Sequence, residues 1–170
     1  MRFKRNPLFW VAAIASLILD HLTKFWVVQT FELTIPPDTL PILPDIFHFT
    51  YVVNTGAAFS LFSDGGVYWL RWLSLFVSLA LMAMAWFGPR CDHLEQLGYG
   101  LILGGALGNG IDRFIAGHVV DFLDFRLIRF PVFNLADVSI NLGILCLLLG
   151  IFRASPPRPR PLEQDELKRS

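Results

Sequence analysis

Four apolar stretches dominate this chain, and each approaches the roughly twenty residues of helix that are needed to cross a bilayer. They cover positions of about 8–28, 68–88, 97–115 and 133–152. Soluble domains carry roughly a quarter charged residues, whereas charged residues make up only 16% of these 170 positions. The sequence therefore predicts an all-α membrane protein with four transmembrane helices, accompanied by a small extracytoplasmic β element.

Lysine and arginine are distributed unevenly among the segments that connect these stretches. The N-terminal stub, the 88–96 loop and the C-terminal tail carry most of them. The 29–67 connection has none, and the 116–132 connection has only two. Basic residues tend to stay on the cytoplasmic side of a membrane. We therefore expect both termini in the cytoplasm and both longer connections outside.

The charge balance and the cysteine count restrict the possible partners. Fourteen basic side chains balance fourteen acidic ones, so no basic face for a nucleic acid is expected. Cys91 and Cys146 are too few for a disulfide framework and lack the spacing of metal ligands, and the histidines are scattered. No metal and no cofactor are expected. Residues 1–153 are predicted to form one transmembrane domain, and residues 154–170 a mobile cytoplasmic tail.

The outer connection, at about 30–66, carries a short β pattern. Aromatic and branched side chains alternate over 47–53, which is the period of a strand. Asn54-Thr55-Gly56 then reads as a turn. Because a lone two-stranded ribbon is marginally stable in water, we expect this β-cradle to lean on the helices at the outer membrane surface.

Polar side chains gather at one membrane level, although such groups are costly there unless paired or hydrated. In the expected topology the outer leaflet receives Asp20, Lys24, Asn109, Asp112, Arg113, Asp121, Asn134 and Asp137. A shared outer site explains this best. Asp20 and Lys24, four residues apart, are interpreted as an ion pair that locks the bundle. The Asn109, Asp112 and Arg113 face fits structure and site organisation equally well, and an Asp112–Arg113 pair is one possibility.

The third apolar stretch also holds Gly100, Gly104 and Gly108 at intervals of four residues. Small residues at this spacing let helix backbones approach closely in lipid. We interpret these glycines as helix-packing residues, which bring the polar residues that follow them close to another helix.

Asp121 and Asp137 differ from the other polar residues of this group. Asp121 has no basic neighbour in the immediate sequence, and Asn134 and Asn141 fall on the helix face of Asp137, where they can orient a carboxylate without neutralising it. Two carboxyl groups that meet in a poorly hydrated site hold a single proton between them. The carboxylate can then activate a water while the acid polarises a carbonyl oxygen. The alternatives are a helix N-cap for Asp137 and a solvated loop residue for Asp121.

Five blocks of the sequence together resemble the bacterial lipoprotein signal peptidases, the type II signal peptidases. The blocks are Asp20-His21-Leu22-Thr23-Lys24, Asn54-Thr55-Gly56-Ala57-Ala58-Phe59, the run from Gly104 to Arg113, His118-Val119-Val120-Asp121-Phe122 and Phe133-Asn134-Leu135-Ala136-Asp137. The resemblance implies a monomeric intramembrane aspartic endopeptidase of the bacterial inner membrane, with its site near the outer face. Its implied substrates are prolipoproteins that carry diacylglycerol on a cysteine, cut just before that cysteine, and its implied inhibitors are lipopeptides such as globomycin.

The same resemblance implies roles for individual residues. Asp121 and Asp137 correspond to the catalytic pair. Asp20 and Lys24 correspond to a structural pair. The positions that shape the site or hold substrate correspond to Asn54, Gly56, Asn109, Asp112, Arg113 and Asn134.

Two other classes of membrane protein could use such polar residues. A small proton-coupled transporter also places Asp, Arg and Asn within its spans, but a through-path needs polar groups at both membrane levels, and no inverted repeat is visible. A non-catalytic scaffold could use the same groups to join its helices, which leaves Asp121 without an evident partner.

Overall fold

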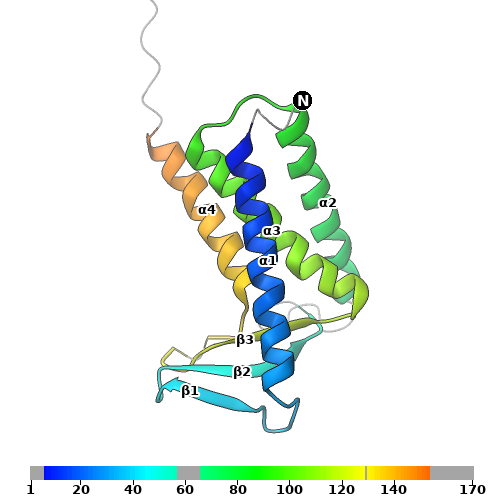
Figure 1. The fold of residues 1–170 in the computed structure, drawn as a ribbon, viewed down its shortest axis with the longest axis vertical. Coiled ribbons are helices and arrows are strands. Elements are labelled where there is room, and N and C mark those ends of the chain that lie inside the picture. Colours follow the sequence, from blue (N-terminus) through cyan, green and yellow to red (C-terminus); the bar gives the residue numbers. More distant parts are fainter. Residues whose placement is uncertain (1–5, 57–65, 129, 154–170) are drawn as a thin grey trace, which may run out of the picture.

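The computed structural model describes residues 6–56, 66–128 and 130–153. In this part of the chain, helices run alongside one another and a small sheet lies across one end of them (Figure 1). The helices are α1 (Pro7–Thr30), α2 (Gly66–Phe87), α3 (His93–Ile115) and α4 (Leu135–Arg153), and the strands are β1 (Thr39–Leu43), β2 (Phe47–Asn54) and β3 (Val119–Phe125). The N-terminal basic residues, the stretch 57–59, Arg129 and the tail 154–170 lie outside the described residues.

Each predicted apolar stretch contains one of these helices, with ends that differ from the prediction by a few residues. Three of the described helical segments are long and apolar enough to cross a membrane: Pro7–Thr30, Trp69–Phe87 and Leu135–Arg153. Helix α3 is similar in length, at 23 residues, but glycines and polar side chains make it less apolar. The fourth span therefore stays a prediction.

Helix α3 packs against each of the other three helices, and its glycines allow a close approach. A Cβ added at Gly104 would fall 2.6 Å from the carbonyl oxygen of Ala13 in α1. One added at Gly105 would collide with the carbonyl oxygen of Ala136 in α4. Gly100 lies equally close to the α1 backbone. The interpretation of these glycines as packing residues is confirmed.

The sheet has the order β1-β2-β3, and both pairs of strands are antiparallel. The strand predicted over 47–53 is confirmed as β2. Asp121 lies within the predicted 116–132 connection, but in a strand that was not predicted: it is in β3, opposite Val52 of β2. The run 119–125 does not alternate polar and apolar side chains, so periodicity does not reveal this strand, and its pairing partner is distant in sequence. The third strand stabilises what would otherwise be a marginal ribbon.

The sheet rests on the end of α1 through an apolar cluster that consists of Val27, Phe31, Tyr51 and Phe122. The segment before α4 also joins the sheet, since the backbone N–H of Leu123 donates to Phe133 O at 2.8 Å and Phe133 donates back at 3.1 Å. These contacts place β3 directly beside the start of α4.

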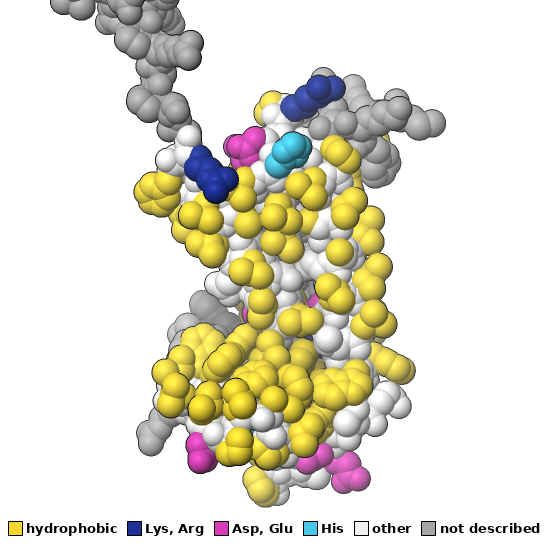
Figure 2. All heavy atoms as spheres, turned by 60° about the vertical axis from the view of Figure 1, so that its left-hand side comes forward, with side chains coloured by type: hydrophobic (Ala, Val, Ile, Leu, Met, Phe, Trp, Pro, Cys, Tyr) yellow, Lys and Arg dark blue, Asp and Glu magenta, His cyan; other side chains and the backbone are white. Residues whose placement is uncertain are grey.

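Charge is distributed asymmetrically along the long axis of the molecule. On the face drawn in Figure 2, hydrophobic side chains cover the middle and basic side chains lie at the helical end, whereas acidic side chains lie both at that end and along the far edge of the sheet. Arg90 and Arg153 lie at helix ends remote from the sheet, whereas Glu32 and Asp45 flank the sheet. The orientation of the chain in a membrane stays a prediction.

Candidate active site

A cavity of about 570 Å³ lies where α3 ends, α4 begins and β3 passes between them. Both Asp121 and Asp137 line it, so the structure brings together the two acids that the sequence analysis singled out. Its other polar lining residues are Asn54, Asn109, Arg113, Asn134 and Asn141, and its apolar wall includes Val138, Leu142 and Leu145 of α4. The cavity thus has a polar end and an apolar end.

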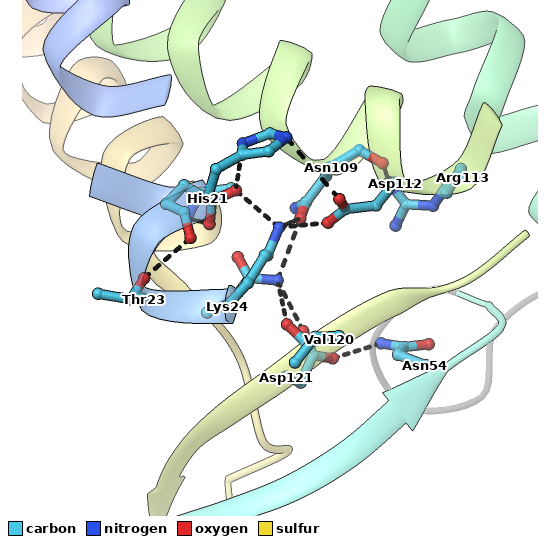
Figure 3. Close-up of polar contacts among 12 residues, drawn as sticks. His21, Thr23, Lys24, Asn54, Asn109, Asp112, Arg113, Val120 and Asp121 are labelled. Carbon is cyan, nitrogen blue, oxygen red and sulfur yellow. Dashed lines mark hydrogen bonds and ion pairs between the residues drawn. The ribbon is translucent and has the colours of Figure 1, made fainter. Parts of the chain in front are cut away.

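Asp121 is buried in β3, with 3% of its surface exposed. Its Oδ1 accepts a hydrogen bond from Asn134 Nδ2 at 2.7 Å, and its Oδ2 accepts one from Asn54 Nδ2 at 2.8 Å (Figure 3). The alternative interpretation of Asp121 as a solvated loop residue is therefore wrong. Each carboxyl oxygen has one fixed donor and keeps lone-pair capacity for a proton or a water.

Burial raises the pKa of Asp121 from 3.8 to about 6. The amide N–H of Asn54 favours the ionised form and limits this rise, while the nearby Asp137 carboxylate adds to it. The N–H of Asn134 also limits it. The net result is a carboxyl group that holds a proton up to a pH near 6 and remains close to two amide donors.

Asp137 lies in the first turn of α4 and takes part in capping it. The backbone N–H of Asp137 donates to Asn134 Oδ1 at 3.1 Å, and the backbone N–H of Asn134 donates to Asp137 Oδ2 at 3.2 Å. This reciprocal arrangement is a capping box, so Asn134 is the cap residue and Asp137 is its partner. The other oxygen of Asp137 accepts from Asn109 Nδ2 at 2.9 Å.

Two of the asparagines that contact the acids are oriented by backbone groups. The N–H of Gly56 donates to Asn54 Oδ1 at 2.9 Å, which turns the Nδ2 group of Asn54 toward Asp121. Likewise the N–H of Asp137 holds Asn134 Oδ1, which leaves Asn134 Nδ2 to face Asp121. Because amide nitrogen can only donate and amide oxygen can only accept, these bonds fix both orientations.

Lys24 links α1 to α3 next to the acids, and its partner Asp20 links α1 to α4. Its Nζ donates to Asp20 Oδ2 at 2.7 Å, to Asp112 Oδ2 at 2.7 Å and to Asn109 Oδ1 at 2.9 Å (Figure 3). Asp20 is fully buried, and its Oδ1 accepts from the backbone N–H of Ala136 in α4 at 2.9 Å. The predicted Asp20–Lys24 ion pair is present, and it also reaches Asp112 and the start of α4.

Arg113 and Asp112 separate, although they are adjacent in sequence. Asp112 bonds to Lys24 and lies 4.0 Å from His21 Nε2. Arg113 is 9% exposed, lines the cavity and donates from Nη1 to Asn109 O at 3.3 Å. Within the described ranges no ion pair joins Asp112 to Arg113, so that suggested pair does not form there. The Nε of Arg113 is buried without a hydrogen-bond partner.

One wall of the cavity was not predicted from the sequence. Phe130, Pro131, Val132 and Phe133 line it, and Phe133 stacks on Phe125 at 5.9 Å between ring centroids. A proline within an aromatic run was the available signal for an extended segment. Among the described residues no cluster of three His, Cys, Asp or Glu could hold a metal ion.

Known proteins are similar to this chain over most of its length, including the segments that line the cavity. The model of the signal peptidase (SPase) II family, peptidase A8, matches residues 12–153. The lipoprotein signal peptidase of Cyanothece sp. (strain PCC 7425 / ATCC 29141) is 65% identical over 160 residues, which are 94% of this chain and 91% of that protein. That of Nostoc sp. (strain PCC 7120 / SAG 25.82 / UTEX 2576) is 66% identical over 163 residues, covering 94% and 100%.

The fold is also similar to a solved structure. A bacterial membrane enzyme determined by the in meso method at 2.3 Å resolution superposes with a TM-score of 0.75 at 26% identity, and the match covers 87% of this chain and 92% of that one. Sequence and fold therefore agree along nearly the whole described chain. The chain belongs to the signal peptidase II family and is a membrane-embedded peptidase.

Proposed function

We propose that this protein removes the signal peptide from diacylglyceryl-modified prolipoproteins by cutting just before the lipidated cysteine. The observation that carries the proposal is the meeting of Asp121 and Asp137, from separate segments, at the polar end of a cavity whose other end is apolar. Family membership supports the reaction class. A peptide bond would lie against the acids, and the acyl chains of the substrate against α4.

The two acids divide the work of hydrolysis. Asp137 accepts a proton from a water, whose oxygen attacks the scissile carbonyl carbon, while Asp121 gives its proton to the carbonyl oxygen. The tetrahedral intermediate then collapses. Asp137 returns its proton to the leaving amine, the C–N bond breaks, and the new carboxyl group gives a proton back to Asp121. The raised pKa of Asp121, about 6, supports its assignment as the acid.

The surrounding polar residues hold this pair and the substrate. Asn54, Asn109 and Asn134 each donate to a carboxyl oxygen of the pair. We assign substrate contact to Arg113, whose buried Nε is free to donate to a peptide carbonyl oxygen. Gly56 and Asp112 act through Asn54 and Lys24 respectively, and Asp20 with Lys24 joins the helices.

The proposed setting is the bacterial cytoplasmic (inner) membrane, with four spans and both termini in the cytoplasm. The site then lies near the outer face, where lipid and water are both accessible. Residues 1–153 form the peptidase domain and 154–170 the cytoplasmic tail. The protein acts as a monomer, and a globomycin-type lipopeptide occupies the same cavity. The transporter alternative has less support, because the buried charged groups among the described residues all lie at the sheet end: Asp20, Lys24, Arg113 and Asp121.

One experiment tests the proposal directly. The purified protein in liposomes is given one prolipoprotein peptide in a diacylglyceryl form and in an unmodified form, with a chelator present in both. We expect cleavage of the lipidated form, with a new N-terminal cysteine found by mass spectrometry. Equal cleavage of both forms, or a cut at another bond, would contradict the proposed substrate. Proton or solute flux without cleavage would favour a transporter.

A further inference from the structure

Asn109 is held differently from the other two asparagines that contact the acids. Backbone N–H groups orient Asn54 and Asn134, whereas the oxygen of Asn109 faces the ammonium of Lys24 from another helix, at 2.9 Å. An ammonium carries only donors. Lys24 can therefore face the oxygen of Asn109 but not its nitrogen.

The orientation of Asn109 determines what Asp137 meets. With its oxygen toward Lys24, Asn109 places Nδ2 2.9 Å from Oδ1 of Asp137. The reverse orientation would set the amide oxygen against that carboxyl oxygen, and two acceptors repel unless Asp137 carries a proton between them. Asn134 Nδ2, which donates to Asn109 Oδ1 at 3.0 Å, favours the same orientation.

We propose that Lys24 is a positioning residue for the reaction: it fixes the amide orientation of Asn109, and through that amide it keeps Asp137 as the proton acceptor. The chain of hydrogen bonds runs from Lys24 on α1 through Asn109 on α3 to Asp137 on α4. This inference rests on the proposed function, since it assumes that Asp137 is the base. It gives Lys24 a role beyond that of half an ion pair.

The arrangement of Lys24 supports this role. Its side chain is buried, and one ammonium donor goes to each of Asp20, Asp112 and Asn109. The two carboxylates alone would satisfy its charge, so the bond to Asn109 is not needed for charge pairing. A buried ion pair also gives little net stability by itself. The other charged groups that line the cavity beside Asp137 are Asp121 on β3 and Arg113 on α3.

The test compares Lys24→Met with Asp20→Asn in the liposome cleavage assay. Lys24→Met removes the donor to Asn109, and we expect kcat to fall about 10- to 100-fold with little change in KM. Lys24→Arg, which also carries only donors, should recover part of the rate.

Asp20→Asn is the matched control. It breaks the same ion pair but keeps Lys24 in place, because the new amide oxygen can still accept from the ammonium. The amide nitrogen then faces the N–H of Ala136, which loses its acceptor, so the cost falls on stability. We expect a lower midpoint of thermal unfolding and a kcat within about threefold of wild type. If Lys24→Met does not fold, Asp20→Asn/Lys24→Met removes the most buried unpaired carboxylate and should show the same loss of kcat.

Combination with Asn109→Ala tests the path itself. If Lys24 acts through Asn109, the double variant should be no slower than Asn109→Ala alone. Two outcomes would each overturn the inference: a double variant whose rate loss is the product of the two single losses, or a Lys24→Met rate within about threefold of wild type. Asp121→Asn and Asp137→Asn run in the same assay separate the two proposals. If these remain active, the proposed function fails; if they are inactive and Lys24→Met is fully active, only the role of Lys24 fails.

Discussion

Buried amide side chains occur at both ends of the helical bundle, but they do different work at the two ends. Remote from the sheet, Asn6 and Gln96 bond almost entirely to backbone: Asn6 Oδ1 accepts from Cys91 N–H at 3.1 Å, and Gln96 Nε2 donates to Cys91 O at 2.8 Å. At the sheet end, Asn54 and Asn109 donate to side-chain carboxylates instead.

The difference separates two roles of buried polar side chains in a membrane protein: some support the structure, and others take part in the chemistry of the site. Backbone groups at helix ends and in loops need partners wherever they are buried, and the amides of Asn6 and Gln96 supply them. A carboxylate held by amide donors has no such structural need. Burial of an amide is therefore a poor guide to function, and the group that it contacts is a better one.

Replacing either acid should give the largest effect. Asp121→Asn and Asp137→Asn each keep the shape of the side chain but remove the ability to exchange a proton, so turnover should fall by about 10³-fold or more. Cleavage of the lipidated peptide and circular dichroism in detergent measure turnover and folding. A folded variant with near-normal turnover would show that the acid it lacks is not part of the reaction.

Asn134 has both a structural and a chemical role, because it caps α4 and donates a hydrogen bond to Asp121. Asn134→Ala should lower kcat about 10- to 100-fold and the free energy of unfolding by about 1–2 kcal/mol. Asn134→Ser keeps a capping oxygen but loses the amide donor, so it should recover stability and not rate. Recovery of both would assign Asn134 to capping alone.

Asn54 should control the pH dependence of the reaction. Only protonated Asp121 can donate, so kcat/KM should decline as the pH rises past about 6, the pKa of Asp121. The N–H of Asn54 favours the ionised form. Asn54→Leu removes it, so the pKa of Asp121 should rise and the alkaline limb should move to higher pH. A pH series of kcat/KM measures this shift, and a limb that stays in place or moves lower contradicts it.

Gln96 should give the smallest effect on the reaction. Gln96→Ala leaves the backbone N–H of Leu8 and the backbone oxygen of Cys91 without their partner. The free energy of unfolding should fall by about 1–3 kcal/mol, measured by thermal or denaturant unfolding in detergent. The kcat of the folded fraction and its pH profile should match wild type. A changed pH profile would show that a buried amide remote from the sheet also influences the acids, and the proposed difference between the two ends would be wrong.

Much of the site could be predicted because its residues share a membrane level. Hydropathy placed the helices, and the polar residues of three helices then fell at one end. Strand β3 could not be predicted, since the run 119–125 lacks the two-residue alternation of 47–53 and gains its structure from pairing with β2. The aromatic wall at Phe130–Phe133 depends on the same pairing, and so was missed.

Sequence spacing also could not assign the partners of each charge. Asp112 and Arg113 are neighbours in the chain, yet Asp112 bonds to Lys24 of α1. The reach of Lys24 to Asn109 depends on how closely two helices approach, which spacing along one helix does not give. The glycines indicated that approach, but not which side chains it would bring into contact.

The close contact between α1 and α3 at Gly100 and Gly104 also sets how far one helix can slide along the other. With backbone against backbone at Gly100 and Gly104, one helix cannot slide past the other by a fraction of a turn without a collision. The longitudinal setting of Lys24 against Asn109 is thereby fixed from several turns away. Replacing either glycine with alanine would add a methyl group away from the catalytic residues. It would nevertheless shift the ammonium of Lys24 relative to Asn109 and slow the reaction.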